Sequence, residues 1–304
     1  MLWTEKYRPK SLRDIKGQEH FVLDAEGWIE DKNMPNVLLY GNAGCGKTAA
    51  GLALAKTLLG KYAKDNFVEV NASDDRRLET VRTVIKNIAQ SGTIGDVPFR
   101  ICLLDEMDGM TTDAQNALKR IMERYSNNIR FIITCNDRSK IIYPLQSRCA
   151  NYHFKPLSNE VILEVIKGIL HREQITIFGD EELTRLIYSL DGDLRRAITE
   201  IQAAKTSGFS LTKQIESSME EYDKILILLL NKNPNESLKE LHNLIYEGRS
   251  PKELCLGLHN SVINSKGLDS IIKFKLLRTI GESEWRSTTM TPKVLISWMV
   301  GQLI

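Results

Sequence analysis

The segment GNAGCGKT (41–48) constrains the fold of this chain more than any other stretch. It matches the pattern G-x-x-x-x-G-K-[ST], and it stands between the apolar run VLLY (37–40) and the helix-forming run KTAAGLALAKTLLG (47–60). Glycines let the backbone curl so that its N–H groups face phosphate oxygens, and the start of the next helix adds the positive end of its dipole. The segment therefore predicts a phosphate site between a strand and a helix.

Two side chains of this loop have predicted chemical roles. Lys47 is expected to reach the β- and γ-phosphates of ATP, and the Thr48 hydroxyl is expected to hold Mg²⁺. The other residues expected to contact the nucleotide belong to the same loop and the first turn of its helix: Gly41, Asn42, Ala43, Gly44, Cys45, Gly46 and Ala49.

A second motif, which is acidic, indicates which reaction takes place at the phosphate loop. ICLLDEMD (101–108) places Asp105 and Glu106 at the end of an apolar strand. Asp105 is expected to bind Mg²⁺ through water, and Glu106 to polarise the attacking water as a general base. A strand followed by a solvated acidic turn is common and is the alternative when the motif is taken alone. A kinase would use a similar loop, but the Asp-Glu pair favours attack by water, so we predict an ATPase.

The rest of the chain predicts an α/β domain followed by helices. Further strands are expected at FVEV (67–70), RICLLD (100–105) and RFIITC (130–135). Short apolar runs that alternate with helical patterns indicate a parallel sheet flanked by helices. We expect the helix in TTDAQNALKRIMERYS (111–126) to begin with a capping box made by Thr112 and Gln115.

The strand signals fade after FKPLSNE (154–160), and the remaining patterns are those of amphipathic helices. We therefore predict three domains: a nucleotide-binding α/β domain at 1–155, a helical lid at 156–214 and an all-helical domain at 215–304.

Composition excludes several classes of protein. A net charge of +2 does not indicate a strongly basic nucleic-acid binder, so any such contact must come from a local patch. The longest apolar run, ILILLL (225–230), is far shorter than the roughly 20 residues that span a bilayer, and the N-terminus has no signal-peptide pattern. The five cysteines form no C-x-x-C motif, which argues against zinc and disulfides and favours a reducing intracellular compartment.

Three polar residues outside these motifs have two interpretations each. Asn136 follows the strand RFIITC, where its amide could orient a water beside the γ-phosphate or could simply open a turn. Arg195 follows a helix cap at Asp193 and could face the nucleotide or the solvent. Arg148, in IIYPLQSRCANYHF (141–154), has no obvious acidic partner among its neighbours, which leaves open whether the negative charge it serves is on this chain.

Six segments together resemble one known family. In order they are WTEKYRP (3–9), GNAGCGKT (41–48), NASDDRRLETVR (71–82), LLDEMDGMTTDAQNALKRIMERYS (103–126), CNDRSKIIYPLQSRC (135–149) and GDLRRA (192–197). They resemble the small subunit of replication factor C, the clamp-loader ATPase of archaea and eukaryotes, which belongs to the AAA+ class. The resemblance covers about residues 2–210 and continues more weakly, with LIYEGRSPKEL (244–254) similar to the family's collar domain. Asn42 and Cys45 depart from the family's usual proline and threonine.

The resemblance implies roles for the residues left open above. Arg148 of the S-R-C box would be an arginine finger that points at the γ-phosphate bound by the adjacent subunit. Asn136 would be sensor 1 and Arg195 sensor 2. The N-terminal segment with Tyr7, Arg8 and Pro9 would pack near the adenine.

The resemblance also implies contact with DNA. Arg82 and Lys86 are four residues apart on an expected helix that begins near Asp75, so both cations would share one face and could follow successive phosphates. From the residues alone, a solvated surface paired with Glu79 is the alternative. The family pattern has glycine near position 77, so the part of Arg77 in this patch is open.

The partners implied by the resemblance are the large subunit and other small subunits in a pentameric ring, the sliding clamp (PCNA) and primer–template DNA, without a membrane. The region 88–99 would be a loop near the clamp. The compartment would be the cytoplasm of an archaeon or the nucleus of a eukaryote. Two rivals remain: a structural subunit that does not hydrolyse ATP, and another AAA+ DNA remodeller such as a branch-migration motor.

Overall fold

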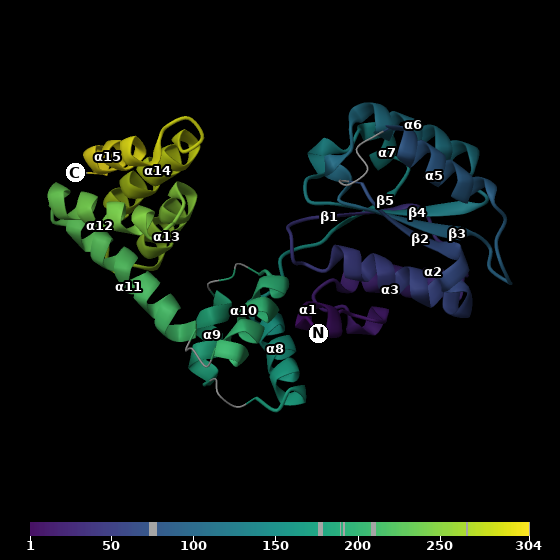
Figure 1. Ribbon diagram of the computed structural model, residues 1–304, viewed down its shortest axis with the longest axis horizontal. Helices are drawn as coiled ribbons and strands as arrows, with labels where there is room; N and C mark the ends of the chain where they lie inside the picture. Colours follow the sequence, from purple (N-terminus) through teal and green to yellow (C-terminus); the bar gives the residue numbers. More distant parts are fainter. Residues whose placement is uncertain are drawn as a thin grey trace. The chain divides into compact units, whose positions relative to one another are not determined.

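The computed structural model describes residues 1–72, 78–175, 179–188, 190, 192–207, 211–265 and 267–303 (Figure 1). The chain divides into two compact units, Met1–Phe209 and Ser210–Ile304. The first unit contains the sheet with its helices and the lid helices, and the second contains helices alone. The three-domain division at 155/156 and 214/215 stays a prediction.

A parallel five-stranded sheet forms the centre of the first unit. Its strands are β1 (Val37–Tyr40), β2 (Phe67–Asn71), β3 (Arg100–Asp105), β4 (Ile129–Cys135) and β5 (Ala150–His153). They lie in the order β2-β3-β4-β1-β5, and every neighbouring pair is parallel. This confirms the predicted fold class and adds one short strand, β5, that the sequence did not single out.

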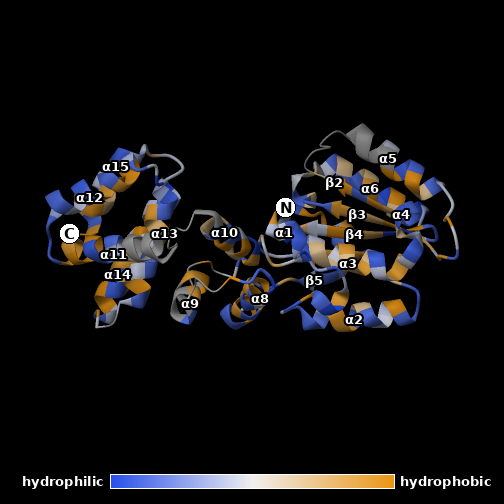
Figure 2. Ribbon diagram, turned by 60° about the horizontal axis from the view of Figure 1, so that its bottom comes forward, coloured by the Kyte–Doolittle hydropathy of each residue, from blue (hydrophilic) through white to orange (hydrophobic). Residues whose placement is uncertain are grey.

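Helices cover both faces of the sheet because its strands are apolar on both sides. Helices α2 (Glu19–Glu30) and α3 (Lys47–Leu59) cover one face, and α5 (Leu78–Gln90), α6 (Thr112–Arg124) and α7 (Tyr143–Gln146) cover the other (Figure 1). Successive strand residues alternate between the two cores: Leu103 packs in the α3 cluster and Leu104 in the α6 cluster. Figure 2 shows β3 and β4 as mostly hydrophobic ribbons between the two helical layers.

The start of α6 differs from the predicted capping box. Thr111 is the N-cap, and its side chain accepts a hydrogen bond from the Ala114 N–H at 3.4 Å. Gln115 is 1% exposed, and its amide donates to the Met110 and Lys140 carbonyls and accepts from the Ile142 N–H. The box prediction was wrong because Thr111, not Thr112, is the N-cap, and Gln115 instead bonds to the loops at Met110 and at Lys140–Ile142.

The remaining elements of the first unit lie around this sheet. The N-terminal helix α1 spans Trp3–Lys6, and the short helix α4 spans Ala63–Asn66. Single 3₁₀ turns span Leu12–Asp14, Gly60–Tyr62, Met107–Gly109 and Arg138–Lys140. The lid helices are α8 (Asn159–Arg172), α9 (Asp180–Tyr188) and α10 (Leu194–Ser207), and α1 packs against α10.

The second unit is a helical bundle with its own core. Its helices are α11 (Leu211–Leu230), α12 (Pro234–Tyr246), α13 (Pro251–Asn264), α14 (Ser270–Arg286) and α15 (Pro292–Leu303). Buried residues such as Leu241, Leu258 and Ile296 form one apolar cluster that these helices share. No helix in the described part of the chain combines the length and apolar character needed to cross a membrane.

Candidate nucleotide-binding site

The predicted phosphate loop lies at the carboxyl end of β1, and α3 begins at Lys47 directly after it. Gly44 and Gly46 adopt positive φ angles of 78° and 93°, which glycine tolerates at little cost. A Cβ at Gly41 would lie 2.1 Å from the Phe154 carbonyl oxygen, so this position also requires glycine. The loop thus has the curled backbone that a phosphate-binding turn needs.

The Lys47 side chain lies inside this loop and bonds to Asn136, the predicted sensor 1 residue. The ammonium donates to the carbonyl oxygens of Gly41 at 2.8 Å and Asn42 at 2.7 Å, and to Oδ1 of Asn136 at 3.0 Å. The residue is 8% exposed. Lys47 and Asn136 are therefore side by side although 89 residues separate them in the sequence.

Thr48 and Asp105 also meet at this edge of the sheet. The Thr48 hydroxyl donates to the Asp105 carboxylate at 2.9 Å (Oδ1) and 3.2 Å (Oδ2), and Thr134 of β4 donates a further hydrogen bond to Oδ1. A hydroxyl beside a carboxylate is the kind of oxygen pair that Mg²⁺ prefers, directly or through water. These residues fit a magnesium ion held beside the phosphates.

Glu106 follows Asp105 with a left-handed backbone, at a φ of 54°. Its N–H donates to the Thr134 hydroxyl at 3.2 Å, and the residue is exposed. Non-glycine residues seldom adopt this conformation, and such residues are common at functional sites. Glu106 is therefore an exposed acidic residue directly after Asp105, which bonds to Thr48. Nothing in the sequence signals the left-handed conformation.

Cys45 packs within the loop. It is 2% exposed, its thiol donates to the Asn42 carbonyl at 2.9 Å, and burial raises its pKa. A protonated thiol at this position is a small packing group, consistent with its place where the family usually has threonine.

The lid reaches the phosphate loop through Asp193, a contact that the sequence did not predict. Asp193 precedes α10 and accepts a hydrogen bond from the Arg196 N–H at 3.0 Å, which confirms it as a helix cap. A Cβ on Gly44 would lie 2.0 Å from Oδ1 of Asp193, so the carboxylate lies directly against the loop. Arg195, the predicted sensor 2, is exposed two residues after this contact.

The N-terminal residues predicted to lie near adenine are held by other side chains. The Tyr7 hydroxyl donates to Oε1 of Glu173 at 2.8 Å, and the Arg8 guanidinium donates to Oε1 of Glu5 at 2.7 Å. Pro9 directly follows Arg8 in the chain. Contact between this segment and adenine stays a prediction.

Arg148 lies away from the chain's own phosphate loop. It precedes Ala150, which pairs with Val37 at the amino end of β1, whereas the loop follows Tyr40 at the carboxyl end. The length of β1, roughly 13 Å, therefore separates the two levels of the sheet.

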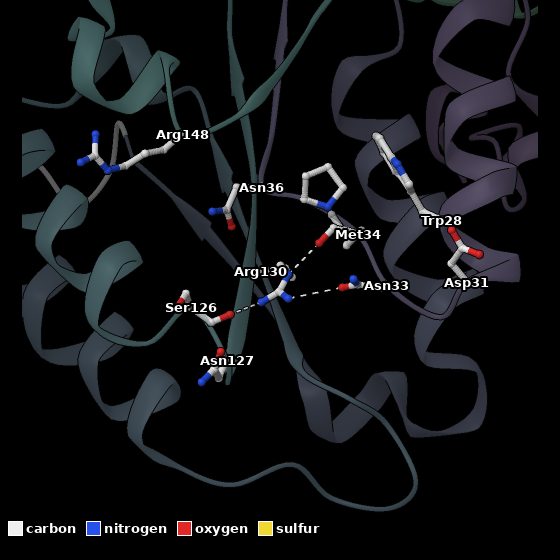
Figure 3. Close-up of a pocket in the computed structure, with 10 residues that line it drawn as sticks. Trp28, Asp31, Asn33, Met34, Asn36, Ser126, Asn127, Arg130 and Arg148 are labelled. Atoms are coloured by element: carbon white, nitrogen blue, oxygen red, sulfur yellow. Dashed lines mark hydrogen bonds between the residues drawn. The ribbon is translucent and has the colours of Figure 1, made fainter.

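The acidic partner of Arg148 is Glu123 of α6, 25 residues earlier in the chain. Arg148 also donates to the Pro144 carbonyl at 2.7 Å, and it lines an open cavity of about 600 Å³ (Figure 3). At the centre of this cavity, Arg130 donates to the Met34 carbonyl at 2.6 Å and to Oδ1 of Asn33 at 3.3 Å. Sequence neighbours gave no hint of the Glu123 pair, because it forms between helix α6 and the turn that precedes β5.

The predicted DNA residues lie on α5. Lys86 is exposed, whereas the side chain of Arg82 and the whole of Arg77 lie outside the described residues. The segment 88–99 begins as the last turn of α5 and becomes a loop after Gln90. Asn66 fastens this loop by two hydrogen bonds to the backbone of Ile94, at 2.8 and 2.9 Å.

Comparison with known proteins agrees with this geometry. Residues 37–157 match the model of the "ATPase family associated with various cellular activities (AAA)". A protein of Methanococcus maripaludis (strain C7) named "Replication factor C small subunit" is 38% identical over 291 residues, covering 93% of this chain and 92% of the relative. A protein of the same name from Archaeoglobus fulgidus is 40% identical over 294 residues, covering 94% and 92%.

A solved structure also has a similar fold. The Thermotoga maritima RuvB Holliday junction branch migration motor is superimposed with a TM-score of 0.56 at 17% identity, covering 83% of this chain and 85% of the other. At that identity the similarity concerns the fold alone.

Proposed function

Because the chain belongs to the family of replication factor C small subunits, we propose that it is a clamp-loader subunit whose ATP sites are completed by neighbouring subunits. The observation that supports this best is the separation within one chain: Lys47, Asn136, Thr48 and Asp105 meet at the carboxyl end of the sheet, whereas Arg148 lies at the amino end. A chain built this way offers a phosphate site on one side and an arginine on another.

In the proposed mechanism, the phosphate loop from Gly41 to Ala49 holds the triphosphate, with Lys47 at the β- and γ-phosphates. Thr48 and Asp105 would hold Mg²⁺, directly or through water, which neutralises charge on those phosphates when it is bound. Tyr7, Arg8 and Pro9 would contact the adenine.

The proposed chemical step uses Glu106 and Asn136. Asn136 orients a water, and the Glu106 carboxylate accepts a proton from it as the water oxygen bonds to the γ-phosphorus. The bond from that phosphorus to the β–γ bridging oxygen breaks, giving ADP and phosphate. Arg195 from the lid and Arg148 from the adjacent subunit stabilise the charge that develops on the γ-phosphate oxygens.

The partners in this proposal are the large subunit and other small subunits of the loader, the sliding clamp, and primer–template DNA contacted by Arg82 and Lys86. The compartment is that of DNA replication, the cytoplasm in an archaeon and the nucleus in a eukaryote. We expect ATP turnover by the assembled loader to rise more with primed DNA and clamp together than with either alone. A DNA effect without any clamp effect would instead favour a branch-migration motor.

Separate variants test the two parts of the proposed site, the phosphate side with Lys47 and Glu106, and Arg148 from the adjacent subunit. Glu106→Gln should lower turnover by about 10²–10⁴-fold while ATP still binds, and Arg148→Ala should lower it by about 10³–10⁵-fold. In an assembly where copies are neighbours, a mixture of Lys47→Ala and Arg148→Ala chains should regain turnover, because one chain's intact arginine meets the other's intact phosphate loop. Unchanged turnover in Glu106→Gln would indicate a structural subunit, and a mixture without recovery would refute the shared site.

A further inference from the structure

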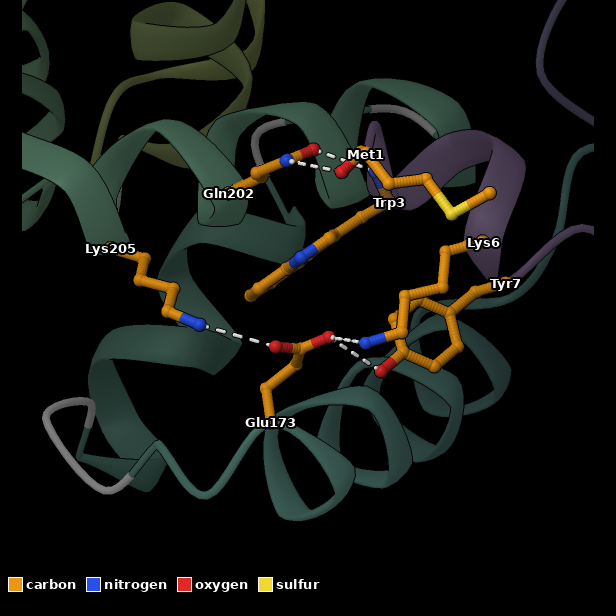
Figure 4. Close-up of polar contacts among 7 residues, drawn as sticks. All are labelled: Met1, Trp3, Lys6, Tyr7, Glu173, Gln202 and Lys205. Carbon is orange, nitrogen blue, oxygen red and sulfur yellow. Dashed lines mark hydrogen bonds and ion pairs between the residues drawn. The ribbon is translucent and has the colours of Figure 1, made fainter.

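A single carboxylate at the end of α8 joins three segments of the first unit. Glu173 accepts hydrogen bonds from the Lys6 ammonium at 2.5 Å and the Tyr7 hydroxyl at 2.8 Å, both on Oε1, and from the Lys205 ammonium of α10 at 3.1 Å on Oε2 (Figure 4). Its side chain is only 11% exposed. Hydrogen bonds from these partners lower the pKa of the Glu173 carboxyl to about 2, and the bond from Lys6 has the largest effect, followed by the bond from Tyr7.

The same N-terminal segment is attached to α10 at a second point. Trp3 is 4% exposed, and its backbone N–H donates to Oε1 of Gln202 at 2.8 Å. Nε2 of Gln202 donates back to the Met1 carbonyl at 3.2 Å, and the Lys205 ammonium lies 5.3 Å from the centre of the Trp3 ring (Figure 4). The N-terminal segment is therefore fixed to the far half of α10.

The near end of α10 is the end that contacts the phosphate loop. Asp193, just before the helix, lies against Gly44, and Gln202 and Lys205 follow it by nine and twelve residues. At 1.5 Å per residue, roughly 14–18 Å of rigid helix separates the two contacts. One helix thus contacts the phosphate loop at its start and carries the N-terminal segment near its end.

We propose that Glu173 is a positioning residue of the nucleotide site, which fixes the N-terminal segment to α10 so that Tyr7, Arg8 and Pro9 move together with the lid. The base and the phosphates of one nucleotide then contact a single body. This inference rests on the proposed function, since adenine contact by that segment is part of it.

The test measures binding of two ligands, with Mg²⁺ present, to the full chain by calorimetry: ATP, and inorganic tripolyphosphate, which has no base. Glu173→Gln should weaken ATP binding by about fivefold, the low end of typical coupling between sites, and leave tripolyphosphate binding within experimental error. Lys205→Met, which removes one donor and leaves the carboxylate in place, should act in the same direction to a smaller extent.

Two control variants make each outcome decisive. Glu164→Gln changes another carboxylate of α8, one that pairs with Lys16 at 3.3 Å with a side chain 68% exposed, and should alter neither affinity. Lys47→Met should weaken both ligands. If it weakens neither, the proposed ATP site itself is wrong, whatever Glu173 does.

An effect of Glu173→Gln confined to ATP supports the positioning role. Equal losses for ATP and tripolyphosphate mean that the residue only stabilises the fold, and no loss for either means that the contact has no bearing on nucleotide. Both results overturn the inference. If Glu173→Gln does not fold, Lys205→Met is judged by the same comparison.

Discussion

The contact between the lid and the phosphate loop can be tested with two glycines that differ in one respect. Gly44 and Gly46 both have left-handed backbones, with φ angles of 78° and 93°. A Cβ at Gly44 would lie 2.0 Å from Oδ1 of Asp193, whereas a Cβ at Gly46 would meet no atom within 4 Å. Gly46→Ala is therefore the matched control for Gly44→Ala.

The expected costs follow from this geometry. The left-handed conformation costs about 1 kcal/mol for a residue with a Cβ, and this applies to both variants. In Gly44→Ala the new methyl also displaces the Asp193 carboxylate from the loop and from the Arg196 N–H that it caps, and loss of such a cap costs about 1 kcal/mol. We expect a destabilisation of about 1 kcal/mol for Gly46→Ala and about 2 kcal/mol for Gly44→Ala.

Scanning calorimetry of the nucleotide-free chain would measure these costs. For a unit of this size, 1 kcal/mol lowers the melting temperature by about 3 °C, so the two variants should melt about 3 and 6 °C below the wild type. Asp193→Ala alone should cost about 1 kcal/mol. The double variant Gly44→Ala/Asp193→Ala should cost about 2 kcal/mol, because the cap is lost only once.

Two results would refute the reasoning. If Gly44→Ala is no worse than Gly46→Ala, the carboxylate does not lie against the loop. If the double variant equals the sum of its single changes, about 3 kcal/mol, the two positions are not in contact.

Three further predictions concern the first unit. Because its pKa is lowered, Glu173 stabilises the fold at pH values above its ordinary pKa of 4.5, and this contribution disappears as the pH falls from 4.5 to about 2. Over that range the melting temperature should fall more steeply in the wild type than in Glu173→Gln, and parallel curves would contradict this. Gln115→Ala should cost about 3 kcal/mol in urea unfolding, because it leaves the Met110 and Lys140 carbonyls and the Ile142 N–H without this partner. A cost below about 1 kcal/mol would mean that water replaces the amide. Burial raises the pKa of Cys102, Cys135 and Cys149 to about 12. A disulfide reagent at pH 8 should therefore label these thiols far more slowly in the native chain than in urea. Rapid labelling of Cys149 in the native chain would show that its surroundings open.

Local patterns were sufficient to predict the sheet and the phosphate loop. Four strands are apolar runs bounded by polar or turn residues, and the glycine pattern of 41–48 has few uses other than a phosphate turn. The meeting of Thr48 with Asp105 also follows from the sequence. Parallel strands end at one edge of the sheet, Asp105 is the last residue of β3, and the phosphate loop that leads to Thr48 follows β1.

Contacts between separate elements were not predictable in the same way. The pairing of Arg148 with Glu123 depends on how α6 packs beside the turn before β5, and the contact of Asp193 with Gly44 depends on where the lid lies. Gln115 has the spacing of a helix cap, yet its amide bonds to the Met110 and Lys140 carbonyls and to the Ile142 N–H, partners that only the packed fold brings together. A single sequence does not give the distances between elements on which these contacts depend.

If the ATP site is shared between subunits as proposed, the Glu123 partner of Arg148 accounts for a site that is inactive in one chain and still easy to complete. Both side chains of the pair are partly exposed, at 35% and 46%, and exposed pairs of this kind contribute at most about 1 kcal/mol. A γ-phosphate in a neighbouring subunit carries more charge than a carboxylate and binds a guanidinium in the same forked geometry. If Arg148 acts as proposed, the pair keeps the side chain ordered in the free chain, and the phosphate of a correctly docked neighbour can replace Glu123 at little cost.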